Sequence, residues 1–173
     1  MITEPPKTLG DPKDLLTAYL DYYRAVILEK LAGLDEDELR GSRLPTGWTP
    51  LQLVWHLAHV ERRWLVWGLL GENVPDPWGD RGPDERWAVP EGMTAAEVFA
   101  RFEEQCARSR EIVAGAELTD VPPASSKRFE EGTPLPALSW ILFHLLQEYA
   151  RHAGHLDIVR ELADGTVPEQ PGA

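Results

Sequence analysis

The chain is organised around residues 147–157, which read QEYARHAGHLD and lie within the last long helix that the sequence predicts. With about 3.6 residues per turn, Glu148, His152 and His155 fall at i, i+4 and i+7 and share one stripe of that helix. A buried carboxylate beside two imidazoles is costly unless these groups pair or coordinate a divalent cation, which satisfies all of them. The stretch therefore indicates a metal site inside a helical fold.

The other helices are predicted from apolar spacing and from capping signals. Each predicted helix begins at a capping residue and ends near a glycine, and the expected spans are residues 11–33, 49–71, 94–114 and 133–165. Thr133-Pro134 is expected to cap the last of them. Residues 35–39, an acidic run, are interpreted as a short helical turn with Asp35 as its cap or as a solvated charge run. Residue types alone do not choose between these two.

The segments between these helices include two long polar connections, residues 73–93, rich in proline and glycine, and residues 115–132, which bear proline. Trp78 and Trp87 in the first favour a packed loop that covers a pocket. No window alternates apolar and polar residues, so no strands are expected. The prediction is an all-α four-helix bundle with two long connections, formed by residues 1–173 as a single domain with its core at about residues 12–163. The Pro- and Gly-rich tail is expected to fray.

Composition restricts the partners of the protein. The 173 residues include 17 Lys and Arg against 29 Asp and Glu, a formal charge of −12 that disfavours nucleic acid and anionic membrane surfaces and favours a small-molecule partner. The single Cys106 cannot form an internal disulfide, and no basic segment followed by an apolar one opens the chain, so a cytoplasmic location is expected. No apolar run is long enough to span a bilayer. A homodimer formed through helix faces is compatible with such a bundle.

Completing the metal site requires a ligand from another helix. His56 is in register with the apolar stripe of the second helix, whereas His59 falls at its edge, so His56 is the better third ligand. The predicted set of His56, Glu148 and His152 suits Zn²⁺, with Ni²⁺, Fe²⁺ or Mn²⁺ as other candidates. Three protein ligands leave one position open, as in catalytic sites. His155 is then a catalytic general base, a residue that holds a ligand in place, or a fourth ligand.

Several other polar residues are interpreted as structural. His59 and His144 are expected to pack beside the site or to support it, residues 61–63 (ERR) are expected to form a solvated helix face, and Cys106 is expected to be a small core residue. The whole set also has a plain structural interpretation, in which the His and Glu side chains merely pair in a helical interaction protein.

Two motifs resemble a known family. Residues 47–50 read GWTP and are followed by His56-Leu57, and residues 148–157 read EYARHAGHLD with Arg160-Glu161 beyond them. Together they are similar to the DinB-like superfamily of bacterial four-helix metalloproteins, in particular to its actinobacterial branch of mycothiol-dependent enzymes. The resemblance covers about residues 12–163.

The resemblance implies a metal held by one His of the second helix and two side chains of the last. Carried over residue by residue, the implied ligands are His56, Glu148 and His152. This His/Glu/His set looks like that of the mycothiol-dependent maleylpyruvate isomerase group. Those isomerases carry an extra C-terminal domain, so their specific reaction does not transfer to this chain.

The predicted function combines the residue pattern with this resemblance. We expect a divalent-metal-dependent transferase or isomerase that uses a low-molecular-weight thiol such as mycothiol as cosubstrate and acts on a small electrophile. In this reaction the thiolate is the nucleophile. The alternatives are a metal-assisted hydrolase and a metal-binding or small-ligand-binding module without catalysis.

Overall fold

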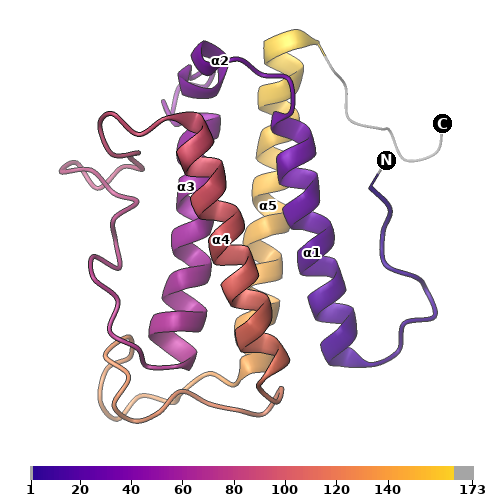
Figure 1. Ribbon diagram of the computed structural model, residues 1–173, viewed down its shortest axis with the longest axis vertical. Coiled ribbons are helices and arrows are strands. Elements are labelled where there is room, and N and C mark those ends of the chain that lie inside the picture. The colour runs from indigo at the N-terminus through magenta and orange to yellow at the C-terminus, as the bar shows by residue number, and fades with distance from the viewer. Residues whose placement is uncertain (1, 166–173) are drawn as a thin grey trace.

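The computed structural model describes residues 2–165 and is built from helices (Figure 1). The helical elements are α1 (Pro12–Leu31), α2 (Glu36–Arg40), α3 (Pro50–Glu61), η1 (Arg62–Leu69), α4 (Ala95–Ala114) and α5 (Leu138–Asp164). In this part of the chain the only strand-like pairing is an isolated bridge between Arg81 and Trp87. The predicted all-α four-helix architecture is confirmed, while the tail predicted to fray lies outside the described residues.

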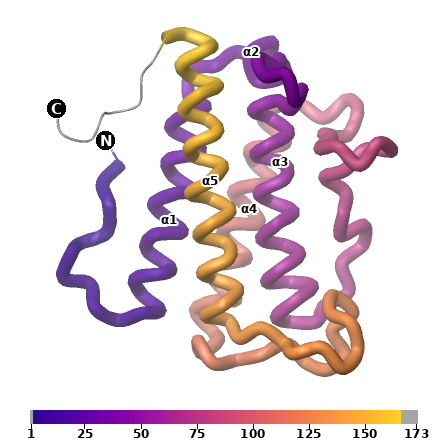
Figure 2. Tube along the Cα trace, turned by 180° about the vertical axis from the view of Figure 1, so that it is seen from behind, coloured from indigo at the N-terminus to yellow at the C-terminus, as the bar shows by residue number. Residues whose placement is uncertain are grey.

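The four long rods are α1, α3 continued by η1, α4 and α5, and they lie side by side (Figures 1 and 2). Helices α1 and α5 run in one direction and α3 and α4 run in the other, so a long connection must return the chain along the bundle. That connection, residues 70–94, is called the crossover below. A second one, residues 115–137, passes under the bundle and is called the lower connection. Within residues 2–165, no helix has the length and apolar character needed to cross a membrane.

The helix starts follow local hydrogen-bond chemistry. The Thr49 hydroxyl accepts a hydrogen bond from the Gln52 backbone N–H at 3.3 Å, and the Gln52 side chain accepts one from the Thr49 N–H at 3.0 Å. Thr94 and Glu97 form the same reciprocal pair at the start of α4. Such pairs satisfy backbone donors that have no partner inside the helix. A third pair, headed by Asp35, shows that the acidic run forms the short helix α2.

The predicted start of the last helix is wrong by four to five residues. Helix α5 begins at Leu138, and the Thr133 hydroxyl instead donates a hydrogen bond to the Glu130 carbonyl at 2.7 Å in a preceding turn. The reason is Pro136, because a residue that precedes proline is driven out of the α-helical region. The predicted end is confirmed, since Gly165 closes the helix with a φ of 75°.

The interior holds a buried polar cluster as well as an apolar core. Glu61 accepts two hydrogen bonds of 2.8 Å from Arg24 and a third from the Tyr149 hydroxyl, and the Cys106 sulfur lies 3.8 Å from the same carboxylate. We call these four residues the core polar cluster. The prediction that residues 61–63 form a solvated face is wrong for Glu61 and Arg63, which are both buried. Cys106 is a core residue, as expected.

The second long helix also changes type near its end. After Glu61 the turns widen into the π-helical segment η1, in which the Leu70 N–H donates to the Leu65 carbonyl, five residues back, at 3.1 Å. Widened turns of this kind are rare and alter which face of the helix each side chain occupies. Arg63, the second residue of η1, points into the protein toward the crossover, where it binds Asp80.

Candidate metal centre

Three side chains predicted as ligands converge between α3 and α5. His56 comes from α3, and Glu148 and His152 come from successive turns of α5. Glu148 Oε2 lies 3.3 Å from His152 Nε2 and 4.0 Å from His56 Nε2, and one atom of each residue lies within 4.8 Å of the others. Donor atoms that share one first-row metal ion are about 3 to 4 Å apart. The structure therefore brings together the three predicted ligands.

His56 is held from behind by the crossover. Its Nδ1 lies 2.8 Å from Oδ2 of Asp80, which is buried and also accepts hydrogen bonds of 2.6 and 3.1 Å from Arg63. Burial alone would raise the pKa of Asp80, but the hydrogen bonds from His56 and Arg63 hold it well below its usual range. An ionised carboxylate only accepts, so Nδ1 of His56 is the donor. In the neutral imidazole, Nε2 then presents a lone pair toward Glu148.

His152 is oriented by His155 in a related way. The two Nδ1 atoms lie 3.3 Å apart, so one of them donates a proton to the other. His152 is buried, and its Nε2 has no hydrogen-bond partner even though the Glu148 carboxylate is close. Burial lowers the pKa of His152 against the opposing effect of Glu148. A neutral His152 whose Nδ1 donates to His155 leaves Nε2 as a second unused lone pair.

Glu148 faces this pair of imidazoles with one oxygen and the surface with the other. Arg151 contacts both carboxylate oxygens at 2.8 and 2.9 Å, and His144 Nε2 lies 4.0 Å from Oε1. Protons on the Nε2 atoms of His152 and His56 would hold the pKa of Glu148 well below its usual range, and the Arg151 charge lowers it in any tautomer. The carboxylate is therefore ionised at neutral pH.

The donor set fits a divalent cation. Two imidazole lone pairs and one carboxylate oxygen point at one another, and all three are acceptors. An unpartnered nitrogen such as His152 Nε2 is costly to bury, and a shared cation removes that cost for all three atoms. Two neutral imidazoles and one carboxylate suit Zn²⁺ and neighbouring first-row ions.

Aromatic side chains form a wall on one side of the centre. Trp87, from the crossover, stacks on His56 with ring centroids 4.2 Å apart and an interplanar angle of 23°. The centroid of the Trp48 ring lies 6.3 Å from that of Trp87 and 6.1 Å from that of His155. A cavity of about 440 Å³ lies against these two Trp rings. None of the three candidate ligands lines it, so it adjoins the centre only through the Trp wall.

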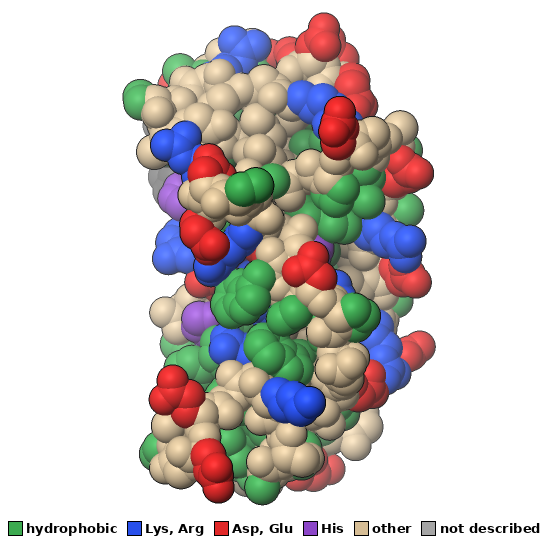
Figure 3. Space-filling view, turned by 90° about the vertical axis from the view of Figure 1, so that its left-hand side faces the viewer, with side chains coloured by type: hydrophobic (Ala, Val, Ile, Leu, Met, Phe, Trp, Pro, Cys, Tyr) green, Lys and Arg blue, Asp and Glu red, His purple; other side chains and the backbone are tan. Residues whose placement is uncertain are grey.

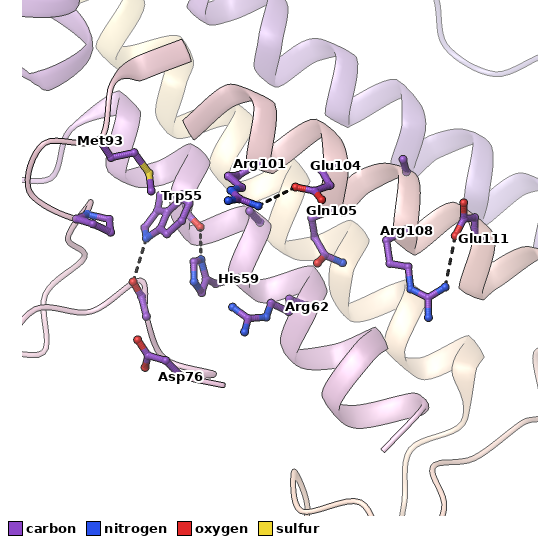
Figure 4. Close-up of a pocket in the computed structure, with 14 residues that line it drawn as sticks. Trp55, His59, Arg62, Asp76, Met93, Arg101, Glu104, Gln105, Arg108 and Glu111 are labelled. Atoms are coloured by element: carbon purple, nitrogen blue, oxygen red, sulfur yellow. Dashed lines mark hydrogen bonds and ion pairs between the residues drawn. The ribbon is translucent and has the colours of Figure 1, made fainter. Parts of the chain in front are cut away.

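A larger cavity, of about 810 Å³, lies elsewhere, between α3, α4 and the crossover (Figure 4). None of the three ligands lines it. His59 does, and its Nδ1 is 2.9 Å from the Trp55 carbonyl oxygen while its ring packs on Trp55 at 4.5 Å. His59 is thus a packed residue that faces away from the ligand set, in agreement with the choice of His56. The chemistry of the donors, and not cavity size, locates the candidate site.

Sequence reasoning missed Asp80 and Arg63, the pair that holds His56. Asp80 comes from an irregular segment 24 residues after His56, where no periodicity indicates which side chain turns inward. Arg63 did carry a signal, because it follows His56 by seven residues and so falls on the same side of the helix. Trp87 was expected to cover a pocket, and its stacking on His56 agrees with that expectation.

Two comparisons with known proteins bear on this site. Among curated proteins, none matches the sequence. The sequence profile of a protein family described as mycothiol-S-transferase matches residues 15–165. This range includes every helix from α1 to α5 except the first three residues of α1. The match contains both halves of the candidate metal centre. The chain therefore belongs to the mycothiol-S-transferase family.

Proposed function

We propose that this protein is a divalent-metal-dependent transferase or isomerase that acts on a small electrophile with a low-molecular-weight thiol of the mycothiol type as cosubstrate. The observation that carries the proposal is the buried, unpartnered Nε2 of His152 facing the Glu148 carboxylate and the Nε2 of His56. Membership of the mycothiol-S-transferase family supports the thiol. In this proposal the ligands are His56, Glu148 and His152, with Zn²⁺ as the first candidate.

A divalent cation at this position would favour the thiolate form of a bound thiol at neutral pH. The remaining tasks belong to the side chains. Asp80 fixes the tautomer of His56, and the crossover ring of Trp87 limits how far that imidazole can turn. Trp48 and Trp87 cover one side of the centre and reduce the access of water that would compete with the thiol.

His155 is not among the residues whose ligand atoms converge, so of its three predicted roles the general base and the positioning residue are compared. As a general base, it takes the thiol proton at Nδ1, and its hydrogen bond with His152 must first break, because a neutral His155 that accepts at Nδ1 carries its own proton on Nε2. As a positioning residue, it holds the tautomer of His152 and acts only through that ligand. The variant His155→Ala distinguishes the base role, which the sequence predicts, from the positioning role. Loss of turnover with metal affinity retained indicates the base, and a parallel loss of both indicates positioning.

The first experiment is metal content by elemental analysis of the purified chain and of two matched variants. We expect about one ion per chain in the wild type, an empty site in His56→Ala, and a filled site in His59→Ala, because both histidines lie on α3 but only His56 faces Glu148. If His59→Ala empties the site and His56→Ala does not, the ligand assignment is wrong.

The second experiment tests the thiol. With Co²⁺ in place of the native ion, addition of the thiol should produce a sulfur-to-cobalt charge-transfer band. Stoichiometric metal without that band would favour the hydrolase or the binding module. If no metal binds even after reconstitution, both the metal-assisted hydrolase and the metal-binding module are excluded. The homodimer, the cytoplasmic location and the single domain over residues 1–173 stay predictions.

A further inference from the structure

Arg128, in the lower connection, is a half-buried arginine enclosed by aromatic rings. Its Cζ lies 4.6 Å from the centroid of Trp64, and three further rings follow at 5.6 to 5.8 Å: Trp67, Phe129 and Trp78. Stacking of this kind fixes the plane of a guanidinium and leaves its N–H groups pointing outward from the ring edges. On the face that carries the crossover, apolar and basic side chains indeed lie next to one another (Figure 3).

The guanidinium of Arg128 lacks the acceptors that its chemistry requires. Its Nε is sealed from solvent without a hydrogen-bond partner, and within residues 2–165 its terminal nitrogens form no ion pair. The two buried arginines, by contrast, each have a carboxylate partner. Arg24 binds Glu61 and Arg63 binds Asp80, each through two nitrogens. The four terminal N–H donors are not sealed and have no acceptor, so they constitute an unfilled site for an anion.

Local charge makes this position distinct from its surroundings. Arg63 and Arg81 flank the Trp78 ring at 4.5 and 4.2 Å, but Asp80 neutralises the first and Glu85 the second. Burial lowers the pKa of Arg128, and the charge of Arg63 lowers it further. Arg128 therefore contributes uncompensated positive charge on a chain whose formal charge is −12.

Arg128 also lies close to the candidate metal centre. The Trp64 ring that stacks on Arg128 also contacts the His144 ring, with ring centroids 4.7 Å apart. His144 Nε2 in turn lies 4.0 Å from Glu148 Oε1. One aromatic ring thus separates the guanidinium from the imidazole beside a proposed ligand.

We propose that Arg128, stacked on Trp64, binds a carboxylate of the electrophilic substrate and so selects anionic electrophiles for this protein. The proposal rests on the proposed function for the identity of the ligand, but the anion site itself does not need the metal. The planar fork of the guanidinium matches the two oxygens of a carboxylate and gives the site its directional preference.

The first test is a titration of the purified, metal-free full-length chain with succinate, followed by tryptophan fluorescence, because the guanidinium is surrounded by Trp rings. Wild type should show a saturable change with succinate and none with neutral succinamide. Arg128→Met should bind about tenfold more weakly or worse, and Arg128→Lys should fall between. The matched control is Arg43→Met, which removes an exposed guanidinium that forms no hydrogen bond or ion pair within residues 2–165. No saturation in wild type, or equal responses in wild type and Arg128→Met, overturns the proposal.

The second test compares an electrophile that carries a carboxylate with its methyl ester, using the metal-loaded protein. Arg128→Met should raise KM for the acid about tenfold and leave KM for the thiol, KM for the ester and metal content unchanged. A rise in KM for the thiol alone overturns the assignment to the electrophile. Absence of turnover with any thiol would instead defeat the proposed function, while the succinate titration would still decide whether Arg128 binds anions.

Discussion

Glu148 and Tyr149 are neighbours in α5, yet their side chains join two polar clusters of opposite character, one partly buried and one fully buried. In the core polar cluster, the Glu61 carboxylate receives hydrogen bonds from Arg24 and Tyr149, so every acceptor has a donor. In the candidate metal centre, acceptors face acceptors, and His152 Nε2 has no partner. A filled network of this kind holds helices together, whereas an unfilled one retains binding capacity. The two clusters should therefore respond oppositely to mutation.

The largest effect is expected from Glu61→Ala. Removing Glu61 leaves the Arg24 guanidinium buried without its carboxylate, which should lower the free energy of unfolding by about 3 to 5 kcal/mol. Urea unfolding of the metal-free protein measures this. The control Glu103→Ala removes an exposed carboxylate from α4 and should change stability by less than about 0.5 kcal/mol. If Glu61→Ala and Glu103→Ala unfold alike, the core polar cluster does not hold the bundle together.

Glu148→Gln should act on binding and not on folding. We expect at least about a hundredfold loss of Zn²⁺ affinity, measured by competition with a chelating dye, because the anionic ligand is replaced by an amide. The stability of the metal-free protein should change by no more than about 1 kcal/mol, because no acceptor is orphaned. Glu161→Gln, an exposed change on the same helix, is the control. A stability loss as large as that of Glu61→Ala would remove the distinction between the clusters.

Asp80→Asn tests whether the crossover contributes to the centre. The amide holds Nδ1 of His56 less firmly and leaves Arg63 without its full ionic partner, so Zn²⁺ affinity should fall about 10- to 100-fold. Asp84→Asn, an exposed change in the same connection, should leave the affinity unchanged. Equal affinities for wild type and Asp80→Asn would show that His56 needs no support from behind.

The smallest effect concerns pH and the core polar cluster. Burial, together with the nearby Glu61 charge, raises the pKa of Cys106, so the folded protein keeps this proton in mild alkali while the unfolded chain loses it. The contribution of the protonated thiol to the free energy of unfolding is therefore fully present below about pH 8.5 and is lost as the pH rises above that value. Between about pH 8.5 and about pH 9.5, wild type should lose about 1 kcal/mol more stability than Cys106→Ala. Parallel pH profiles would contradict the assignment.

Much of the fold was predictable because its signals are local. The Thr49 and Thr94 caps lie next to the helices they start, and the Glu148 and His152 spacing needs only the helical repeat. The start of α5 was misplaced because the cap signal at Thr133 outweighed the proline three residues later. Local rules must be applied together, since a following proline overrides a cap.

The support of the candidate site was harder to predict. Glu61 follows Leu53 and Leu57 at intervals of four, so its place in the buried stripe was visible, but the adjacent arginines suggested solvent instead. Asp80 carried no comparable signal, because side chains of an irregular segment take their direction from packing across the whole bundle. Residues on helices were therefore predictable, and their partner from the crossover was not.

The crossover has a kinetic consequence. Asp80 and Trp87 both contact His56, and both belong to a segment without regular secondary structure. Segments of this kind open locally without global unfolding. One such opening would release His56 from its carboxylate and its stacked ring together. Hydrogen exchange of the crossover amides and the exchange of an ion at His56 are then expected to share one rate. That rate is set by local opening of the crossover and not by the rigid helices.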